Sequence, residues 1–180
     1  MYNVFTGLMS TTSKGELVPE IAKSYTTNND MTKYIFKLNK NIKFHDGSDL
    51  TAADVKYSFD RLCGKTDDQD NPLSSSYANV IDNIVVEDDY TVIINLKQVD
   101  AAFLSKMMVA IIPENSGVSQ AEKPVGAGPY KFKSYTPGMN IVLEKNKDYY
   151  IANQPYIDVV EFKIFSDMNT AVLSLSNGEI

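Results

Sequence analysis

Residues 42–59 read IKFHDGSDLTAADVKYSF, in which a short apolar run is closed by a turn at Asp46-Gly47. A helix then begins at Thr51, whose hydroxyl can accept a backbone N–H while Asp54 returns a bond from three residues on. Apolar residues recur on one face of this helix, and Gly64 ends it. The stretch therefore predicts a tight turn followed by a capped amphipathic helix.

Strand patterns lie on both sides of this helix. Residues 33–39 alternate apolar and polar side chains, and residues 84–87 and 91–97 form a predicted β-hairpin. The helical spacing of apolar residues predicts a short helix over residues 4–9. Residues 65–76 are polar and are expected to form an exposed loop.

The C-terminal half also combines predicted helices with predicted strands. Asp100 is expected to cap a helix over residues 103–108, and Ser166 or Asp167 a last helix that ends at Asn177-Gly178. Strands are predicted near residues 130–135, 140–145 and 157–165. Because these elements follow no regular βαβ order, the sequence predicts an α+β fold.

Composition excludes several classes of function. The chain of 180 residues carries 17 Lys+Arg and 23 Asp+Glu, a net charge of -6 with both signs interspersed, so a nucleic-acid partner is not expected. No run approaches the roughly 18 apolar residues of a membrane helix. With one cysteine, Cys63, and one histidine, His45, no zinc ligand set or internal disulfide is expected, and we predict neither a metal site nor a cofactor.

The carboxylates near the helix start offer the only catalytic hypothesis. His45 and Asp46 could form an acid/base pair, but adjacent strand residues point to opposite faces, and Asp-Gly is typical of a turn. A hydrolase would need Asp46 and Asp49 to face one pocket. No calcium-loop spacing accompanies them, and Asp54 is already assigned to the helix cap. We therefore predict no catalytic residue.

Several segments together resemble the oligopeptide-, dipeptide- and nickel-binding proteins of ABC importers, extracellular solute-binding protein family 5. Each segment alone is a weak signal, but they occur in the family's order across nearly all of the chain. The matching segments are residues 17–25, 34–38, 42–47, 50–59, 124–130 and 177–180. Three positions depart from the family pattern: Asn39 replaces a common arginine, Ala127 a threonine, and Tyr150 a tryptophan.

The resemblance implies a periplasmic-binding-protein-like fold of type II, with two lobes that close on a ligand. Residues 11–123 would form a satellite subdomain, and residues 1–10 and 124–180 part of the first lobe. The second lobe is expected to be missing and the chain to be truncated at both ends, without the signal segment.

The function that the resemblance implies is solute capture and not catalysis. We expect the substrate-binding component of an ABC importer, which binds short peptides outside the cytoplasm, in the periplasm or as a cell-surface lipoprotein, and delivers them to membrane permease subunits. A nickel- or metal-chelate receptor, a sugar receptor and a solute-sensing regulatory module remain alternatives.

Candidate ligand-binding residues are Tyr77, Gly126 and Gly128. The resemblance implies that a tyrosine near Tyr77 can reach the cleft, although a surface-packed aromatic residue also fits the sequence. Glycines 126 and 128 would let two backbones pass closely, or let N–H groups approach an anion. The absence of a third glycine, and Pro129 directly after them, favour the close crossing. Cys63 is expected to be a small, partly buried hydrophobic residue and not a nucleophile.

Overall fold

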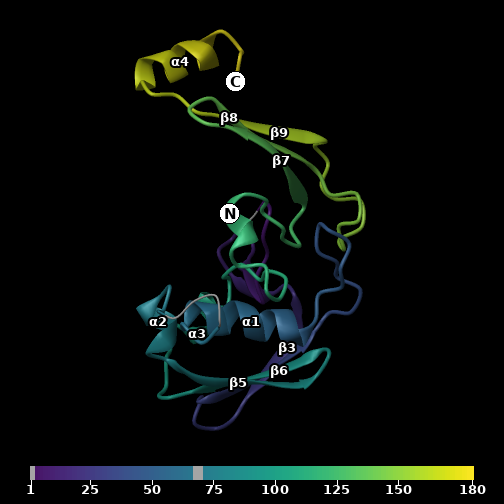
Figure 1. Ribbon diagram of the computed structural model, residues 1–180, viewed down its shortest axis with the longest axis vertical. Helices are drawn as coiled ribbons and strands as arrows, with labels where there is room; N and C mark the ends of the chain where they lie inside the picture. The colour runs from purple at the N-terminus through teal and green to yellow at the C-terminus, as the bar shows by residue number, and fades with distance from the viewer. Residues whose placement is uncertain (1–2, 67–70) are drawn as a thin grey trace.

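The computed structural model describes residues 3–66 and 71–180 and has an elongated shape (Figure 1). A lower body contains a four-stranded sheet and its helix, and an upper arm contains a three-stranded sheet and the C-terminal helix. Within the described ranges, no helix is long and apolar enough to span a membrane. Helices and antiparallel sheets are mixed, as expected for an α+β fold.

The lower sheet has the strand order β3-β4-β6-β5, with every pair antiparallel. The predicted alternation is confirmed, because Phe36 of β4 and Val92 and Ile94 of β6 are fully buried. Burial of each such side chain contributes roughly 1.5–3 kcal/mol. The strands are β3 Ala22–Thr27, β4 Lys33–Leu38, β5 Ile81–Asp88 and β6 Thr91–Leu96.

Helix α1, Ala52–Leu62, packs on this sheet with Val55 and Phe59 fully buried. Its predicted capping box is present. The Asp54 carboxylate accepts the Thr51 backbone N–H at 2.8 Å and the Thr51 hydroxyl at 3.0 Å. The predicted stop is also confirmed, since Gly64 has a φ of +70°.

The predicted helix over residues 4–9 is wrong. Strand β1, Met9–Thr11, instead pairs antiparallel with β2, Leu17–Pro19. The carbonyl of Gly7 accepts the N–H of Ile21, and that of Leu8 accepts the N–H of Glu20. These bonds to a neighbouring segment take the place of helical bonds, and a few apolar residues at helical spacing do not distinguish the two outcomes.

The remaining short elements differ in detail from those that the sequence predicts. The helix predicted over residues 103–108 is only α3, Phe103–Lys106, whose N-cap is Ala102; the Asp100 carboxylate accepts the Ala102 N–H at 2.9 Å. The apolar run at residues 42–44 forms one bridge, between Lys43 and Asp49, and not a strand. Helix α2, Ser75–Ala78, begins where a loop was expected, and residues 67–70 of that loop lie outside the described residues.

The upper arm follows the prediction closely. Its antiparallel sheet has the order β7-β8-β9, and helix α4 begins at the predicted cap, where Asp167 accepts the Thr170 N–H at 2.9 Å. Asn177 is the C-cap, followed by Gly178 with a φ of +73°. The elements are β7 Tyr130–Thr136, β8 Asn140–Lys145, β9 Val159–Lys163 and α4 Met168–Ser176.

Candidate functional site

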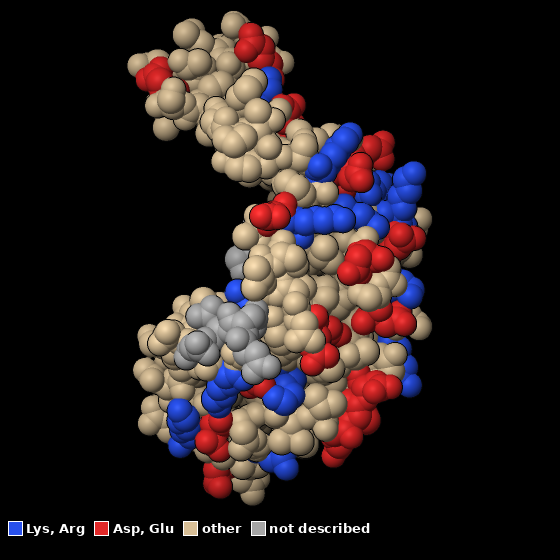
Figure 2. Space-filling model, in the orientation of Figure 1, with Lys and Arg blue, Asp and Glu red and all other residues tan. Residues whose placement is uncertain are grey.

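A groove of about 810 Å³ lies between the lower body and the upper sheet. Figure 2 shows the molecule hollowed between these two parts. Residues 3–5, 121, 122 and 124 line one side of the groove, and five side chains of the upper sheet line the other. Its volume lies in the range of small-molecule sites, which are usually concave and largely apolar.

Strand register explains why this side of the upper sheet is apolar. Phe132 pairs with Leu143, and Ile141 pairs with both Tyr135 and Phe162, so all five side chains emerge on one face. Phe162 remains 44% exposed and Tyr135 53% exposed. An apolar face of this size, open to solvent in the chain described, is typical of a surface that contacts a ligand or other protein.

The opposite face of this sheet is charged. By the same alternation it carries Lys131 opposite Glu144, and Lys163 opposite Asn140. At the end of the sheet, Lys131 lies 3.7 Å from Asp148, and Lys145 lies 3.9 Å from Asp158. Both aspartates are well exposed, so these pairs contribute little stability. The groove side is therefore the apolar side of this sheet.

Gly126 and Gly128 pass directly against the N-terminal segment. A Cβ on Gly126 would lie 2.1 Å from the Val4 carbonyl oxygen, and a Cβ on Gly128 would lie 2.7 Å from the same atom. The Gly128 N–H donates to that oxygen at 2.9 Å. The close backbone crossing expected from these glycines is therefore present, and one of the N–H groups is used within the protein.

His45 holds the turn before α1 to this crossing. Its Nε2 bonds the Gly128 carbonyl oxygen at 2.9 Å, which requires Nε2 to carry the proton. Its Nδ1 accepts the Gly126 N–H at 3.3 Å, and its own backbone N–H donates to the Gly126 carbonyl at 2.9 Å. Both ring nitrogens are satisfied only when the imidazole is neutral. This role could not be predicted from the sequence, because nothing near His45 indicates a partner so far along the chain.

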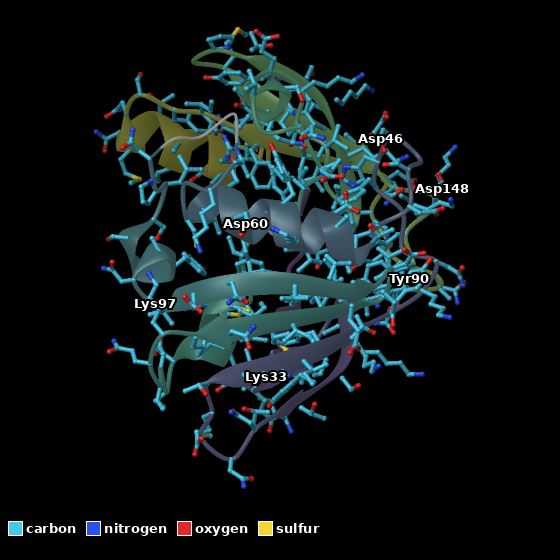
Figure 3. All side chains as sticks on the ribbon, turned by 60° about the horizontal axis from the view of Figure 1, so that its bottom comes forward. Lys33, Asp46, Asp60, Tyr90, Lys97 and Asp148 are labelled. Carbon is cyan, nitrogen blue, oxygen red and sulfur yellow. The ribbon has the colours of Figure 1, made fainter. Side chains whose placement is uncertain are left out.

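The electrostatic surroundings of His45 favour the neutral ring. Burial has the largest effect and lowers the pKa of His45 below its ordinary 6.5, and Lys131 lowers it further. The Gly128 bond and Asp46 act in the opposite direction. Figure 3 shows Asp46 and Asp148 on the same flank of the molecule, and Asp148 faces the Lys131 ammonium.

The two carboxylates of the hydrolase hypothesis, and the nearby Asp54, have separate local partners. Asp46 accepts the N–H and the hydroxyl of Ser48, so it belongs to the predicted turn. Asp49 pairs with Lys43 at 2.7 Å on the surface. Asp54 caps α1 and also accepts the Glu114 N–H at 2.9 Å. Among the described residues, no group of three or more His, Cys, Asp or Glu side chains is placed to hold a metal ion.

Tyr77 lies in the lower body, away from the glycine crossing. Its hydroxyl donates to the Lys106 carbonyl at 2.8 Å, and its ring centroid lies 6.0 Å from that of Phe59. None of Tyr77, Gly126 and Gly128 lines the groove, so the structure does not bring the three candidates together there. Cys63 is buried, and burial raises the pKa of its thiol, as expected for an inert side chain.

The three departures from the family pattern are accommodated without strain on the fold. Ala127 is fully buried. Asn39 donates to the Glu20 carbonyl at 2.8 Å, and the Tyr150 hydroxyl donates to Glu20 Oε1 at 2.7 Å. Two of the three therefore meet at Glu20, which the sequence analysis did not single out.

Comparisons with known proteins agree on one family. The family model for bacterial extracellular solute-binding proteins, family 5 Middle, matches residues 16–180. The oligopeptide-binding protein AppA of Bacillus subtilis is 32% identical over 190 residues, which covers 98% of this chain and 34% of AppA. The chain thus spans about a third of the length of this relative.

Solved structures of similar proteins have the same fold. AppA in complex with a nonapeptide matches with a TM-score of 0.88 and 30% identity, over 99% of this chain and 37% of AppA. NikZ from Campylobacter jejuni in complex with Ni(L-His) matches with a TM-score of 0.88 and 27% identity, over 99% of this chain and 37% of NikZ. The fold is therefore that of type II periplasmic binding proteins, of which this chain spans the part that forms one lobe.

Proposed function

The chain belongs to family 5 of the bacterial extracellular solute-binding proteins, and from this membership we propose that it is part of the substrate-binding component of an ABC importer that captures short peptides. The family consists of solute-binding proteins and not enzymes. The similarity to an oligopeptide-binding protein along 98% of the chain carries the proposal. A location outside the cytoplasmic membrane and delivery to membrane permease subunits belong to the same proposal.

Within the complete protein, residues 1–180 would supply scaffold and one wall of the ligand site. The apolar groove and the open side of the upper sheet are the surfaces that this part offers. Peptides would be held mainly through backbone groups, which leaves side-chain specificity broad. Residues 11–123 would act as the satellite subdomain, with Tyr77, Gly126 and Gly128 as candidate ligand contacts.

Calorimetric titration of the full-length protein with a pool of di- to pentapeptides tests the proposal. We expect saturable binding in the micromolar range, about -8 kcal/mol, as is common for small-ligand receptors. Free amino acids at the same concentration serve as the control and should release no saturable heat. A protein that is folded but binds no peptide in this range would contradict peptide capture.

A metal-chelate receptor is the second candidate, and the likeness to NikZ bound to Ni(L-His) favours it. A chelate brings most of its own metal ligands, so it needs few protein donors. Competition separates the two functions: Ni(L-His) should displace a labelled peptide only if both occupy one cleft. Saturable binding of Ni(L-His) in the absence of peptide binding would favour the second candidate.

A hydrolase has less support. Asp46 and Asp49 are engaged by Ser48 and Lys43, respectively, and line none of the larger cavities together. General acid/base catalysis needs two such groups within reach of one substrate.

A further inference from the structure

A second, smaller cavity of about 330 Å³ lies beside the β1–β2 hairpin and is lined by both polar and apolar residues. Among the described residues that line it, Glu20 is the only charged one, and Thr6, Ser10 and Thr11 contribute hydroxyl groups. Phe5 and Tyr149 add aromatic rings to the wall. Apart from Phe5, this cavity shares no lining residue with the groove of the proposed peptide site.

Glu20 is held in place with one oxygen uncommitted. The Tyr150 hydroxyl donates to Oε1 at 2.7 Å, and Asn39 fixes the Glu20 backbone carbonyl. Burial and the Glu20 charge raise the pKa of Tyr150, so this hydroxyl stays protonated and remains a donor. Among the described residues, nothing donates a hydrogen bond to Glu20 Oε2.

Thr6 offers a second polar group to the cavity. Its side chain is 6% exposed and lines the cavity, yet its hydroxyl makes no hydrogen bond to any residue within ranges 3–66 and 71–180. Because this hydroxyl is not committed within the described part of the protein, it is available to a ligand in the cavity that carries a hydrogen-bonding group.

We propose that this cavity binds a small organic cation that carries a primary ammonium group, with Glu20 as its counter-ion. Three N–H donors of an ammonium match the free Glu20 oxygen and nearby hydroxyls such as that of Thr6. The rings of Phe5 and Tyr149 suit the charge, since aromatic faces attract cations. A bare calcium ion fits less well, because it takes six to eight oxygen ligands and the cavity offers one carboxylate.

Calorimetric titration of the full-length protein with ethanolamine tests the site. We expect saturable binding that ethylene glycol, which lacks the charge, does not reproduce. Tetramethylammonium, which has the charge but no N–H donors, should bind about tenfold more weakly or worse. Absence of saturable ethanolamine binding would overturn the proposal, and equal binding of tetramethylammonium would overturn recognition of the ammonium N–H groups.

Two variants test whether ethanolamine binds at Glu20. Glu20→Gln keeps an acceptor for Tyr150 but removes the charge, and should weaken ethanolamine binding about tenfold or more. Glu16→Gln removes one charge from an exposed position on the same hairpin and should leave binding unchanged. Equal affinity in Glu20→Gln and wild type would overturn the assignment of the counter-ion.

Thr6→Val gives a readout that a purely structural role would not produce. It should weaken ethanolamine binding several-fold, while the midpoint of thermal unfolding is unchanged because the hydroxyl makes no hydrogen bond within the described residues. Unweakened binding in this variant would remove Thr6 from the site. Peptide titration of Glu20→Gln should match the wild type, so failure of the ammonium site and failure of peptide capture are distinguishable.

Discussion

His45 shows how one side chain can join distant segments. Its ring and backbone make three hydrogen bonds to Gly126 and Gly128, and its carbonyl accepts from the Lys131 ammonium at 3.1 Å. The turn before α1 is thereby held to the entry of the upper sheet. Because the ring must be neutral to satisfy both nitrogens, this connection depends on pH.

Stability should fall as the pH is lowered through the range in which unfolded histidine gains its proton. The folded-state pKa of His45 lies below 6.5, so the unfolded chain binds more protons than the folded one near and below pH 6.5. The stabilisation is therefore complete above that pH and decreases below it. Urea unfolding at pH 7.5, 6.5 and 5.5 measures the change.

His45→Gln is the control for this prediction. It has no titrating ring, so the part of the pH dependence between 7.5 and 5.5 that comes from His45 should disappear. If wild type and variant lose the same stability over this interval, the neutral-ring model of the contact is wrong.

Asp54 and Thr51 should differ in importance although they belong to one cap. Thr51→Ala removes one hydroxyl bond and should cost about 1 kcal/mol of unfolding free energy. Asp54→Ala leaves three donors without their acceptor at a buried position and should cost about twice as much or more. Asp49→Ala, at an exposed ion pair, serves as the control and should change stability by less than about 1 kcal/mol.

Urea unfolding of the three variants measures these differences. A Thr51→Ala protein with unchanged stability would show that another group caps α1. A loss in Asp49→Ala as large as that in Asp54→Ala would contradict the ranking of buried over exposed contacts.

At the scale of elements, regular patterns were predictable and tertiary pairings were not. β4, β6 and α1 follow from alternation, spacing and capping residues, and the turn glycines follow from their positions. β3 was missed because its residues Ala22–Thr27 are largely polar and exposed, and only pairing with β4 makes them a strand. The contact between His45 and the glycine crossing could not be predicted because no local pattern encodes it.

The same limit applies to the candidate sites. The glycine crossing was expected from residues 126 and 128, but its partner, Val4, was assigned to a helix. The groove depends on the register of three strands, and the small cavity depends on contacts between Glu20 and residues far along the chain. Sequence patterns indicate which faces are apolar, whereas the shape of a cavity depends on how distant segments pack.

The lower and upper sheets should differ in local stability. The lower sheet is covered by α1, whereas α4 of the upper arm leaves Leu173 and Leu175 more than 60% exposed. Elements with few buried apolar contacts open at lower free energy. In hydrogen exchange of the 180-residue chain, amides of β4 and β6 should therefore exchange more slowly than those of β9 and α4.

Mass spectrometry of peptic fragments resolves these regions. The amides of α1 serve as an internal reference for a covered helix, against which α4 is compared directly. Equal protection in α1 and α4 would show that the exposed helix is stabilised by something other than packing.

At the scale of the whole molecule, the chain is much shorter than its relatives, and its groove is open to solvent. It spans about a third of the length of AppA, and its groove is exposed to solvent along one side. A ligand cleft normally buries most of its ligand and replaces the lost hydration of each charge with a fixed partner. One wall alone cannot do this for a peptide with two charged termini.

Residues 1–180 alone should therefore bind peptides much more weakly than the full-length protein. The expected loss is several kcal/mol, enough to move a micromolar binder at about -8 kcal/mol toward the millimolar range at about -4 kcal/mol. Calorimetric titration of both proteins with the same peptide pool measures it, and a cooperative thermal transition of the shorter chain establishes that the comparison is between folded proteins. Equal affinities would place the whole ligand site within residues 1–180, and the division of the site between two lobes would then be wrong.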